Sequence, residues 1–200
     1  CLLCHVSQIQ AQPFAESKLS NWHQWRGPEA NGVSPTATPP IEWSEGKSIK
    51  WKVAIGGNGR STPIIWGNKV FLLTSIDTGV VDPSLPKPED QPQRVFGIKF
   101  PNTVRRFVVL CLDRDSGKEL WRVDSPIARL TLTVDADSVY YYTGTSLVCL
   151  DRKTGKQRWL QGEIENLNTL TTRYTPTLVS YDDVLLYQHL GKIHGYSRKT

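Results

Sequence analysis

An internal repeat constrains this chain more than any other feature of its sequence. Residues 111–121 read CLDRDSGKELW and residues 149–159 read CLDRKTGKQRW, so seven of eleven positions are identical at an offset of 38 residues. A third copy starts at Gly195 as GYSRKT, 46 residues after the second. Self-similarity at this period indicates stacked copies of one supersecondary unit, none of which buries both of its faces alone.

Each copy follows a segment that has the composition of an antiparallel hairpin. Asp113 and Asp151 are expected to open a tight loop in which the carboxylate accepts backbone N–H bonds. Gly117 and Gly155 are expected to close that loop in the left-handed conformation. Each repeat is therefore a meander of about four strands. From their β-branched, aliphatic and aromatic residues, strands are predicted over 70–74, 107–112, 139–143, 147–150 and 184–187, with polar turns at 67–68, 137–138 and 182–183.

Four-stranded units stacked radially form a β-propeller, whose repeats run about 40–45 residues. We therefore predict an all-β fold, a partial β-propeller of four-stranded antiparallel blades, with about three to four blades of a larger ring. The pattern Leu-Asp-x-x-[Ser/Thr]-Gly-Lys-x-x-Trp resembles the repeat of PQQ-like (quinoprotein-dehydrogenase-like) β-propellers. The resemblance implies that Asp and Gly shape the turn and that the Trp docks between adjacent blades. The residues concerned are Asp113, Ser116, Gly117, Trp121, Asp151, Thr154, Gly155 and Trp159.

Sequence before the repeats extends the resemblance. Ile49-Lys50-Trp51-Lys52 is similar to the Trp-bearing strand of an earlier blade, and residues 22–33 are similar to the lead-in of secreted bacterial members. We expect an N-terminal segment over 12–48 and blades over 49–200. From Trp51 to Trp121 the chain is 32 residues longer than one repeat, which predicts a long inserted loop near 76–106. We interpret this loop as a tolerated insertion, with a partner-contacting arm as the alternative.

The first five residues, CLLCH, match the C-x-x-C-H string of c-type haem attachment. A cytochrome domain needs a second axial ligand, His or Met, and the chain contains no Met. We therefore prefer to interpret residues 1–11 as a signal-peptide remnant, a weak apolar stretch ending at Ala11. This interpretation predicts a periplasmic or secreted protein.

Charge and apolar run length argue against nucleic-acid binding and against a membrane-spanning segment. The formal net charge is +5, from 24 basic and 19 acidic residues scattered along the chain. Nucleic-acid binding requires a basic stripe or a reader motif, and neither is present. No apolar run is long enough to span a bilayer, so no transmembrane segment is predicted.

Candidate chemistry was sought among the cysteines, histidines and glycines. Cys111 and Cys149 occupy equivalent strand positions and are interpreted as core residues, with a disulfide between them left open. His189 and His194 are interpreted as ordinary strand residues, because a metal site would need a third donor. Residues 56–59, GGNG, lack the Lys of a phosphate loop and predict a flexible turn. No catalytic, cofactor-binding or metal-binding residue is assigned.

Two functions follow from the resemblance. The first is a non-catalytic propeller that acts as a protein-interaction scaffold, with no cofactor and with protein or peptide partners at blade edges or the channel mouth. The alternative is a PQQ-dependent quinoprotein oxidoreductase of the alcohol or sugar dehydrogenase type, which would need PQQ and Ca²⁺. We favour the scaffold because the sequence contains the repeat pattern and no additional chemical motif.

Overall fold

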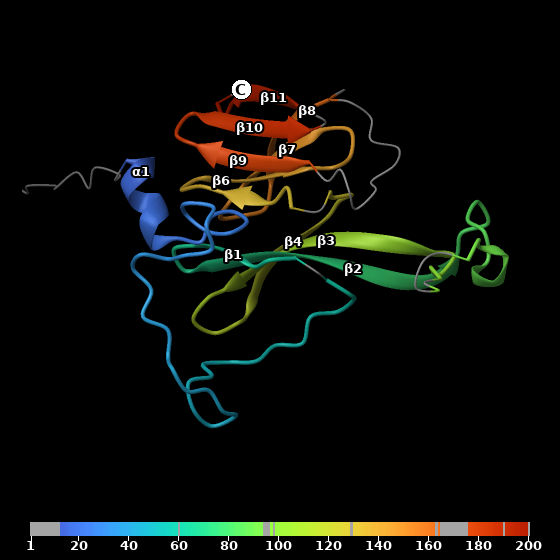
Figure 1. Ribbon diagram of the computed structural model, residues 1–200, viewed down its shortest axis with the longest axis horizontal. Helices are drawn as coiled ribbons and strands as arrows, with labels where there is room; N and C mark the ends of the chain where they lie inside the picture. The colour runs from blue at the N-terminus through green and yellow to red at the C-terminus, as the bar shows by residue number, and fades with distance from the viewer. Residues whose placement is uncertain are drawn as a thin grey trace, which may run out of the picture.

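The computed structural model describes residues 13–59, 61–93, 97, 99–128, 130–162, 164, 176–189 and 191–199. The interpretation of residues 1–11 as a signal-peptide remnant, including the CLLCH string, falls outside the described residues. Within them the chain folds into three antiparallel sheets preceded by a mostly irregular N-terminal segment (Figure 1). The predicted all-β propeller architecture is confirmed, and the sheets do not close into a ring.

Two sheets have four strands and the third has three, each in meander order. Blade A comprises β1 (Ile64–Trp66), β2 (Lys69–Val81), β3 (Thr103–Asp113) and β4 (Glu119–Asp124). Blade B comprises β5 (Thr133–Val134), β6 (Ser138–Tyr142), β7 (Leu147–Asp151) and β8 (Gln157–Gln161). Blade C comprises β9 (Thr177–Tyr181), β10 (Val184–His189) and β11 (Lys192–Ser197).

The blades are stacked face to face about a common side. The first strand of blade B, β5, contacts the first strands of both neighbours, β1 and β9. Two short helical pieces, α1 (Phe14–Ser17) and η1 (Lys18–Ser20), precede the sheets, and no sequence pattern had indicated them. A third, η2 (Pro88–Asp90), lies in the connection between β2 and β3.

Strand β6 shows why the middle blade has an almost continuous apolar and aromatic sequence. Its five residues are all buried, because blade B is covered on both faces. Val139 and Tyr141 face a cluster shared with blade A, whereas Tyr140 and Tyr142 face a cluster shared with blade C. Alternate side chains of a strand point to opposite faces, so a doubly covered sheet needs apolar residues at every position.

The segment near 76–106 contains strand residues at both ends, which the predicted loop did not include. Strands β2 and β3 continue into it, with Ile76 paired to Arg106, Asp77 to Arg105 and Val81 to Thr103. The insertion therefore begins and ends as a two-stranded extension of the blade A hairpin, and the described residues between Val81 and Thr103 lie outside the sheet. We call residues 76–107 the arm, and it projects from blade A at the right of Figure 1. The sequence missed the pairing because Ile76–Val81 and Thr103–Arg106 contain charged and small residues among the apolar ones.

Two predictions just before blade A also need correction. Residues 49–52 form no sheet strand, although Trp51 is docked as described below. The glycine-rich residues 56–59 are not a free turn, because they run beside β2, where Asn58 N–H donates to the Ser75 carbonyl oxygen at 2.8 Å. A Cβ on Gly59 would lie 2.7 Å from the Leu73 carbonyl oxygen. These glycines therefore permit two backbones to approach closely.

Candidate functional site

The predicted turn residues form the same hydrogen-bonded loop in blades A and B. Oδ1 of Asp113 accepts hydrogen bonds from the Ser116 backbone N–H and hydroxyl, both at 2.8 Å. Oδ1 of Asp151 accepts the equivalent pair from Thr154, both at 2.9 Å. Gly117 and Gly155 close the loops with φ of 72° and 73°. A side-chain carboxylate thus takes up backbone donors that the tight turn leaves without strand partners.

Arg158 gives the second of these turns an additional partner. Its Nη2 lies 2.6 Å from Oδ2 of Asp151. The hydrogen bond from Arg158, with those from Thr154, lowers the pKa of Asp151 to about 2. The carboxylate therefore stays ionised throughout the physiological pH range.

The tryptophan of each repeat docks on the turn of the following blade. Trp121 lies in blade A, and its indole N–H donates to the Arg152 carbonyl oxygen of blade B at 3.2 Å. A Cβ on Gly155 would lie 2.8 Å from the Trp121 ring, so the indole packs flat against the glycine. Trp159 repeats the bond from blade B to the Arg198 carbonyl oxygen of blade C at 3.3 Å.

Trp51 makes a third junction of the same kind. Its indole N–H donates to the Arg114 carbonyl oxygen at 2.8 Å, and a Cβ on Gly117 would lie 2.6 Å from its ring. Residues around Trp51 thus stand beside blade A as β4 stands beside blade B. The resemblance of residues 49–52 to a Trp-bearing strand had suggested that Trp51 docks on a blade. The contacts with Arg114 and Gly117 show where it docks.

The arginine of the repeated Asp-Arg or Ser-Arg pair is a junction residue to which the sequence reasoning assigned no role. Arg152 receives the Trp121 bond on its carbonyl oxygen, donates its own backbone N–H to the Asp137 carbonyl, and donates Nε to the Ala136 carbonyl at 2.7 Å. Its Nη1 also reaches the Trp66 carbonyl oxygen of blade A at 3.4 Å. The signal was available, because Arg occupies this position in all three copies of the repeat.

Arg198 connects blade C to blade B through a buried carboxylate. Its Nη1 lies 3.0 Å from Oδ2 of Asp135, whose side chain is almost entirely buried. Tyr140 donates its hydroxyl to the same oxygen at 2.8 Å. Burial, reinforced by the Asp135 charge, raises the pKa of the Tyr140 hydroxyl. The third turn has Ser197 where the others have Asp, and the Ser197 hydroxyl accepts the Lys199 backbone N–H at 3.2 Å.

The N-terminal segment connects the inner strands of the blades. The Trp22 carbonyl oxygen accepts the Ile65 N–H of β1 at 2.7 Å, and the His23 carbonyl oxygen accepts the Val134 N–H of β5 at 3.0 Å. Phe14 stacks on Trp66 and also meets Tyr181, at the end of β9, edge-on. This segment therefore lies beside the first strands of the three blades. It is at the end of the sheets that bears the repeated turns.

His23 is the most deeply buried group of this segment. Its side chain is 1% exposed and lies edge-on to Phe14 and Trp66. Among the residues that the structure describes, its Nδ1 has no hydrogen-bond partner. Burial, and secondarily the positive charge of Lys18, lowers the pKa of His23 to about 4. The imidazole is therefore neutral at physiological pH.

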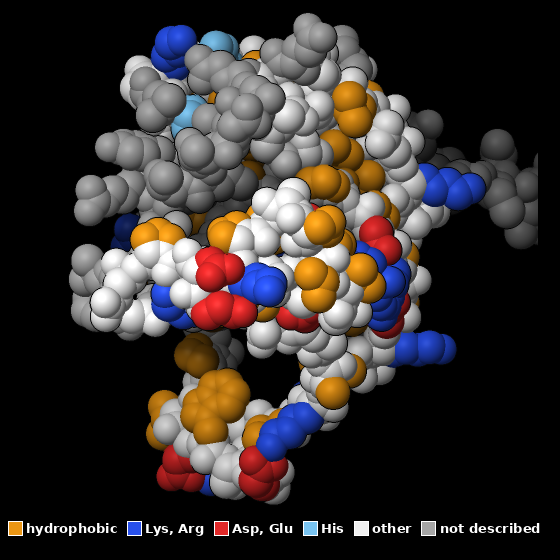
Figure 2. All heavy atoms as spheres, turned by 90° about the vertical axis from the view of Figure 1, so that its right-hand side faces the viewer, with side chains coloured by type: hydrophobic (Ala, Val, Ile, Leu, Met, Phe, Trp, Pro, Cys, Tyr) orange, Lys and Arg blue, Asp and Glu red, His pale blue; other side chains and the backbone are white. Residues whose placement is uncertain are grey.

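The described residues of the arm form a projection with an exposed apolar surface. The Gln91 side chain organises its tip, because its Nε2 donates to the Phe100 carbonyl at 2.7 Å and its Oε1 accepts the Phe100 N–H at 2.9 Å. Figure 2 views the molecule from this side and shows apolar patches among mixed charges. The exposed apolar side chains of the arm include Val80, Val81, Leu85, Phe100, Val104 and Phe107, with Val80 60% and Phe100 51% exposed.

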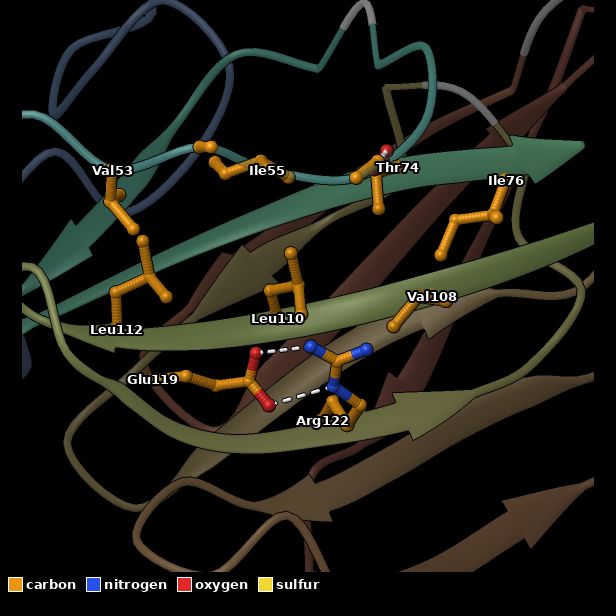
Figure 3. A pocket seen from close by; sticks show the side chains of 11 residues that line it. Val53, Ile55, Thr74, Ile76, Val108, Leu110, Leu112, Glu119 and Arg122 are labelled. Carbon is orange, nitrogen blue, oxygen red and sulfur yellow. Dashed lines mark hydrogen bonds and ion pairs between the residues drawn. The ribbon is translucent and has the colours of Figure 1, made fainter.

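Two clefts open beside the blades. The first cleft, of about 150 Å³, lies between residues 53–56 and the face of blade A formed by Val108, Leu110 and Leu112 (Figure 3). Glu119 and Arg122 form a two-point ion pair at its side, with Arg122 Nε 2.7 Å from Glu119 Oε1. The second cleft, of about 340 Å³, lies between residues 123–126 and blade B.

The remaining candidate residues have core or strand positions. Cys111 and Cys149 are both buried and unpaired, and burial raises their thiol pKa values to about 12 and about 11. His189 and His194 lie on neighbouring strands of blade C. In the described part of the chain, no three side chains of His, Cys, Asp or Glu gather as a metal site would require. Nor does any described helix have the length and apolarity needed to cross a membrane.

Sheets of this order, joined by a repeated Asp-turn and a Trp that docks on the next blade, define the class of fold: the chain is part of a β-propeller, and its repeats are similar to those of PQQ-like proteins. Residues 105–200 match the sequence model of a family described as outer membrane protein assembly factor BamB. A search of curated proteins found no significant match.

At least one solved structure shows the same fold. The quinohemoprotein alcohol dehydrogenase ADHIIG from Pseudomonas putida HK5 aligns with 93% of this chain at 15% identity and a TM-score of 0.51. BamB from Moraxella catarrhalis aligns with 74% at 18% identity and a TM-score of 0.45, and a europium-containing methanol dehydrogenase with 74% at 13% and 0.39. The chain spans 36% of that BamB and 26% and 24% of the two dehydrogenases.

Proposed function

We propose that this chain belongs to a non-catalytic scaffold of the bacterial cell envelope, periplasmic or secreted, which binds other proteins through its arm. The arm carries the proposal. Its backbone is held in place by Gln91 and by β2–β3 pairing, yet it leaves Val80, Val81 and Phe100 exposed. A projection that holds apolar side chains in water is typical of a surface that a partner covers.

The family match supports the same conclusion. The matched description is that of an assembly factor, a protein whose printed role concerns other proteins and names no reaction. The match begins at Arg105, within β3, so it includes one side of the arm's base together with blades B and C. In this proposal the fold presents surfaces and no cofactor takes part.

The test is position-specific photocrosslinking in the native cell envelope. A photoreactive residue placed at Val81 or Phe100 should give a discrete crosslinked protein. The matched control is Ile41, which is 97% exposed but lies in the N-terminal segment outside the arm. Crosslinks of equal yield from all three positions, or none from the arm, would contradict the proposal.

A second measurement separates the scaffold from the oxidoreductase alternative. The protein is incubated with PQQ and Ca²⁺ and assayed for dye-linked oxidation of alcohols and sugars. We expect no turnover above the rate of heat-denatured protein. Cofactor-dependent turnover would reject the non-catalytic reading even if the arm also binds a partner.

A further inference from the structure

The strands of the arm form a two-stranded ribbon (Figure 1), so each strand has one edge outside the pairing. Strand β4 covers the outer edge of β3 only as far as Phe107, whose carbonyl oxygen accepts the Ser125 N–H at 3.0 Å. Pro126 follows and has no N–H to continue the ladder. Within the part of the chain that the structure describes, β3 is therefore paired with β2 alone from Thr103 to Arg106.

The hydrogen-bond pattern shows which backbone groups face this edge of β3. Neighbouring residues of an antiparallel strand direct their N–H and C=O groups to opposite sides. The Phe107 carbonyl points to β4, whereas the Val104 carbonyl accepts the Thr78 hydroxyl of β2 at 2.8 Å. The odd-numbered residues therefore face outward, and the N–H and C=O groups of Thr103 and Arg105 lie on the edge that β4 leaves uncovered.

The other edge of the ribbon belongs to β2, which is irregular there. Its register with β3 shifts between Asp77 and Val81. In this stretch the Gly79 N–H donates to Asp77 Oδ1 at 2.9 Å, and the Val80 N–H donates to the Thr78 hydroxyl at 3.3 Å. A bulged strand that satisfies its own amide groups is a poor template for a further strand. The regular edge of β3 is therefore the one that suits an added strand.

Two arginines decide which kind of strand fits. Arg105 and Arg106 follow one another on β3, and their ion-pair partners, Asp77 and Asp124, lie at 3.7 Å and 3.8 Å. These distances exceed those of hydrogen bonds, so the guanidinium groups keep donors for a further carboxylate. The same edge of a second copy would place four arginines on adjacent strands, which disfavours self-pairing. The edge therefore favours an acidic strand from another protein.

We propose that residues 103–106 of the arm pair with an extended, acidic segment of a partner protein, which adds a strand in line with β4. This inference rests on the proposed scaffold function and specifies how the partner is held. Main-chain hydrogen bonds to Thr103 and Arg105 supply affinity, and carboxylates beside Arg105 and Arg106 supply specificity. An apolar residue of the segment covers Val104, which is 42% exposed.

The first experiment titrates the ¹⁵N-labelled chain with the peptide acetyl-Val-Glu-Glu-Val-Thr-amide. In the antiparallel register its two glutamates lie beside Arg106 and Arg105. The amide signals of residues 103–106 should shift at peptide concentrations up to about 10 mM, because ligands of this size bind in the millimolar range.

Two control peptides separate charge from backbone pairing. Replacing both glutamates with lysine should weaken binding at least about tenfold, because attraction to Arg105 and Arg106 becomes repulsion. Methylating the backbone nitrogen of the second glutamate removes the donor opposite Arg105 and leaves the charge unchanged. This peptide should bind at least about fivefold more weakly than the parent.

Two variants at one position test the location. Thr103→Pro removes an N–H that faces the uncovered edge and leaves the hydrogen bonds between β2 and β3 in place, because that N–H does not point to β2. It should weaken the glutamate peptide at least about fivefold. Thr103→Ala loses the same side chain but keeps the N–H, so it is the matched control and should bind like the wild type.

Absence of shifts with the glutamate peptide, equal binding of its N-methylated form, or equal binding by the two Thr103 variants would overturn the inference. So would a concentration-dependent dimer whose amide shifts map to residues 103–106, because the edge would then pair with a second copy.

These outcomes are distinguishable from failure of the scaffold proposal. If the arm crosslinks at Val81 and Phe100 persist unchanged in Thr103→Pro, the scaffold stands and the β3 edge does not hold its partner. If the crosslinks are lost in Thr103→Pro and kept in Thr103→Ala, the edge holds the partner. Peptide binding without any arm crosslink in the cell envelope would reject the scaffold proposal alone.

Discussion

The indole nitrogen of Trp121 lies 3.2 Å from the carbonyl oxygen of Arg152, which belongs to the turn of the next blade. The same relationship connects Trp51 to Arg114 and Trp159 to Arg198. The junctions of Trp51 and Trp121 each combine a half-buried ring, a glycine against which it packs and one backbone acceptor, and the Trp159 junction shares the backbone acceptor. This arrangement makes the stability of neighbouring blades interdependent, as in other stacked-repeat proteins.

Replacing Trp121 with Ala should lower the free energy of unfolding by about 3–5 kcal/mol, because it leaves a cavity between blades A and B. Trp121→Phe retains part of the ring contact but loses the N–H donor, and should cost about 1–3 kcal/mol. Urea denaturation midpoints measure both. An unchanged midpoint for Trp121→Ala would refute the role of this residue at the junction.

Two glycines offer a matched test of the ring contact. Gly155 and Gly191 have φ of 73° and 76°, so substitution by Ala imposes similar backbone strain of about 1–2 kcal/mol at both. At Gly155 the new Cβ would lie 2.8 Å from the Trp121 ring, whereas at Gly191 nothing lies within 4 Å. We expect Gly155→Ala to be clearly the more destabilising in thermal unfolding. Equal melting temperatures for the two variants would show that the indole is free to move away.

Arg152 should contribute more to stability than Arg114. The half-buried Arg152 guanidinium bonds to the carbonyls of Ala136 in blade B and Trp66 in blade A. The exposed Arg114 reaches one carbonyl, that of Gly67 in its own blade, at 3.2 Å. Arg152→Met should cost about 1–3 kcal/mol because it leaves carbonyl groups without this partner, and Arg114→Met less than about 1 kcal/mol. Chemical denaturation of the two variants measures both losses of stability. A larger loss for Arg114→Met than for Arg152→Met would contradict the role of Arg152 at the junction.

His23 should make the fold sensitive to mild acid. Burial, and then Lys18, lowers its pKa to about 4 from 6.5, while Glu29 acts in the opposite direction. The unfolded chain therefore binds a proton at a higher pH than the folded chain, so stability is lost as pH falls from about 6.5 toward 4. Between pH 7.5 and 5 the loss attributable to His23 should be about 2 kcal/mol.

The comparison that isolates this effect is His23→Phe, which removes the titration while keeping an aromatic ring beside Phe14 and Trp66. Its free energy of unfolding should change less over the same pH interval than that of the wild type. Parallel pH profiles for the two proteins would mean that other groups cause the acid sensitivity.

The sequence predicted the elements that depend on neighbouring residues. Asp113 and Ser116 are three positions apart, and a turn that brings a carboxylate to a backbone N–H can be inferred from that spacing. Gly117 and Gly155 follow from the same turn chemistry, because the left-handed conformation is easily reached by glycine. The buried positions of Cys111 and Cys149 follow from their place in apolar strands.

The arm was predicted less well. Its length was evident, but the pairing of Asp77 with Arg105 and of Val81 with Thr103 was not, because a solvent-exposed ribbon does not need strict apolar alternation. Its alternative reading as a partner-contacting arm is the one that the proposed function adopts. The arginine at the head of each turn was visible as a repeated residue, yet the bonds of Arg152 to two blades appear only when the sheets are stacked.

The sequence by itself determined the repeated unit, since strand propensity, turn chemistry and the position of the glycine act over a few residues along the chain. Tertiary structure decided which carbonyl each Trp reaches and how Trp22 and His23 connect β1 with β5. Those relationships join residues from separate repeats. Their geometry depends on the distance and angle between stacked sheets, which local conformational preferences do not determine.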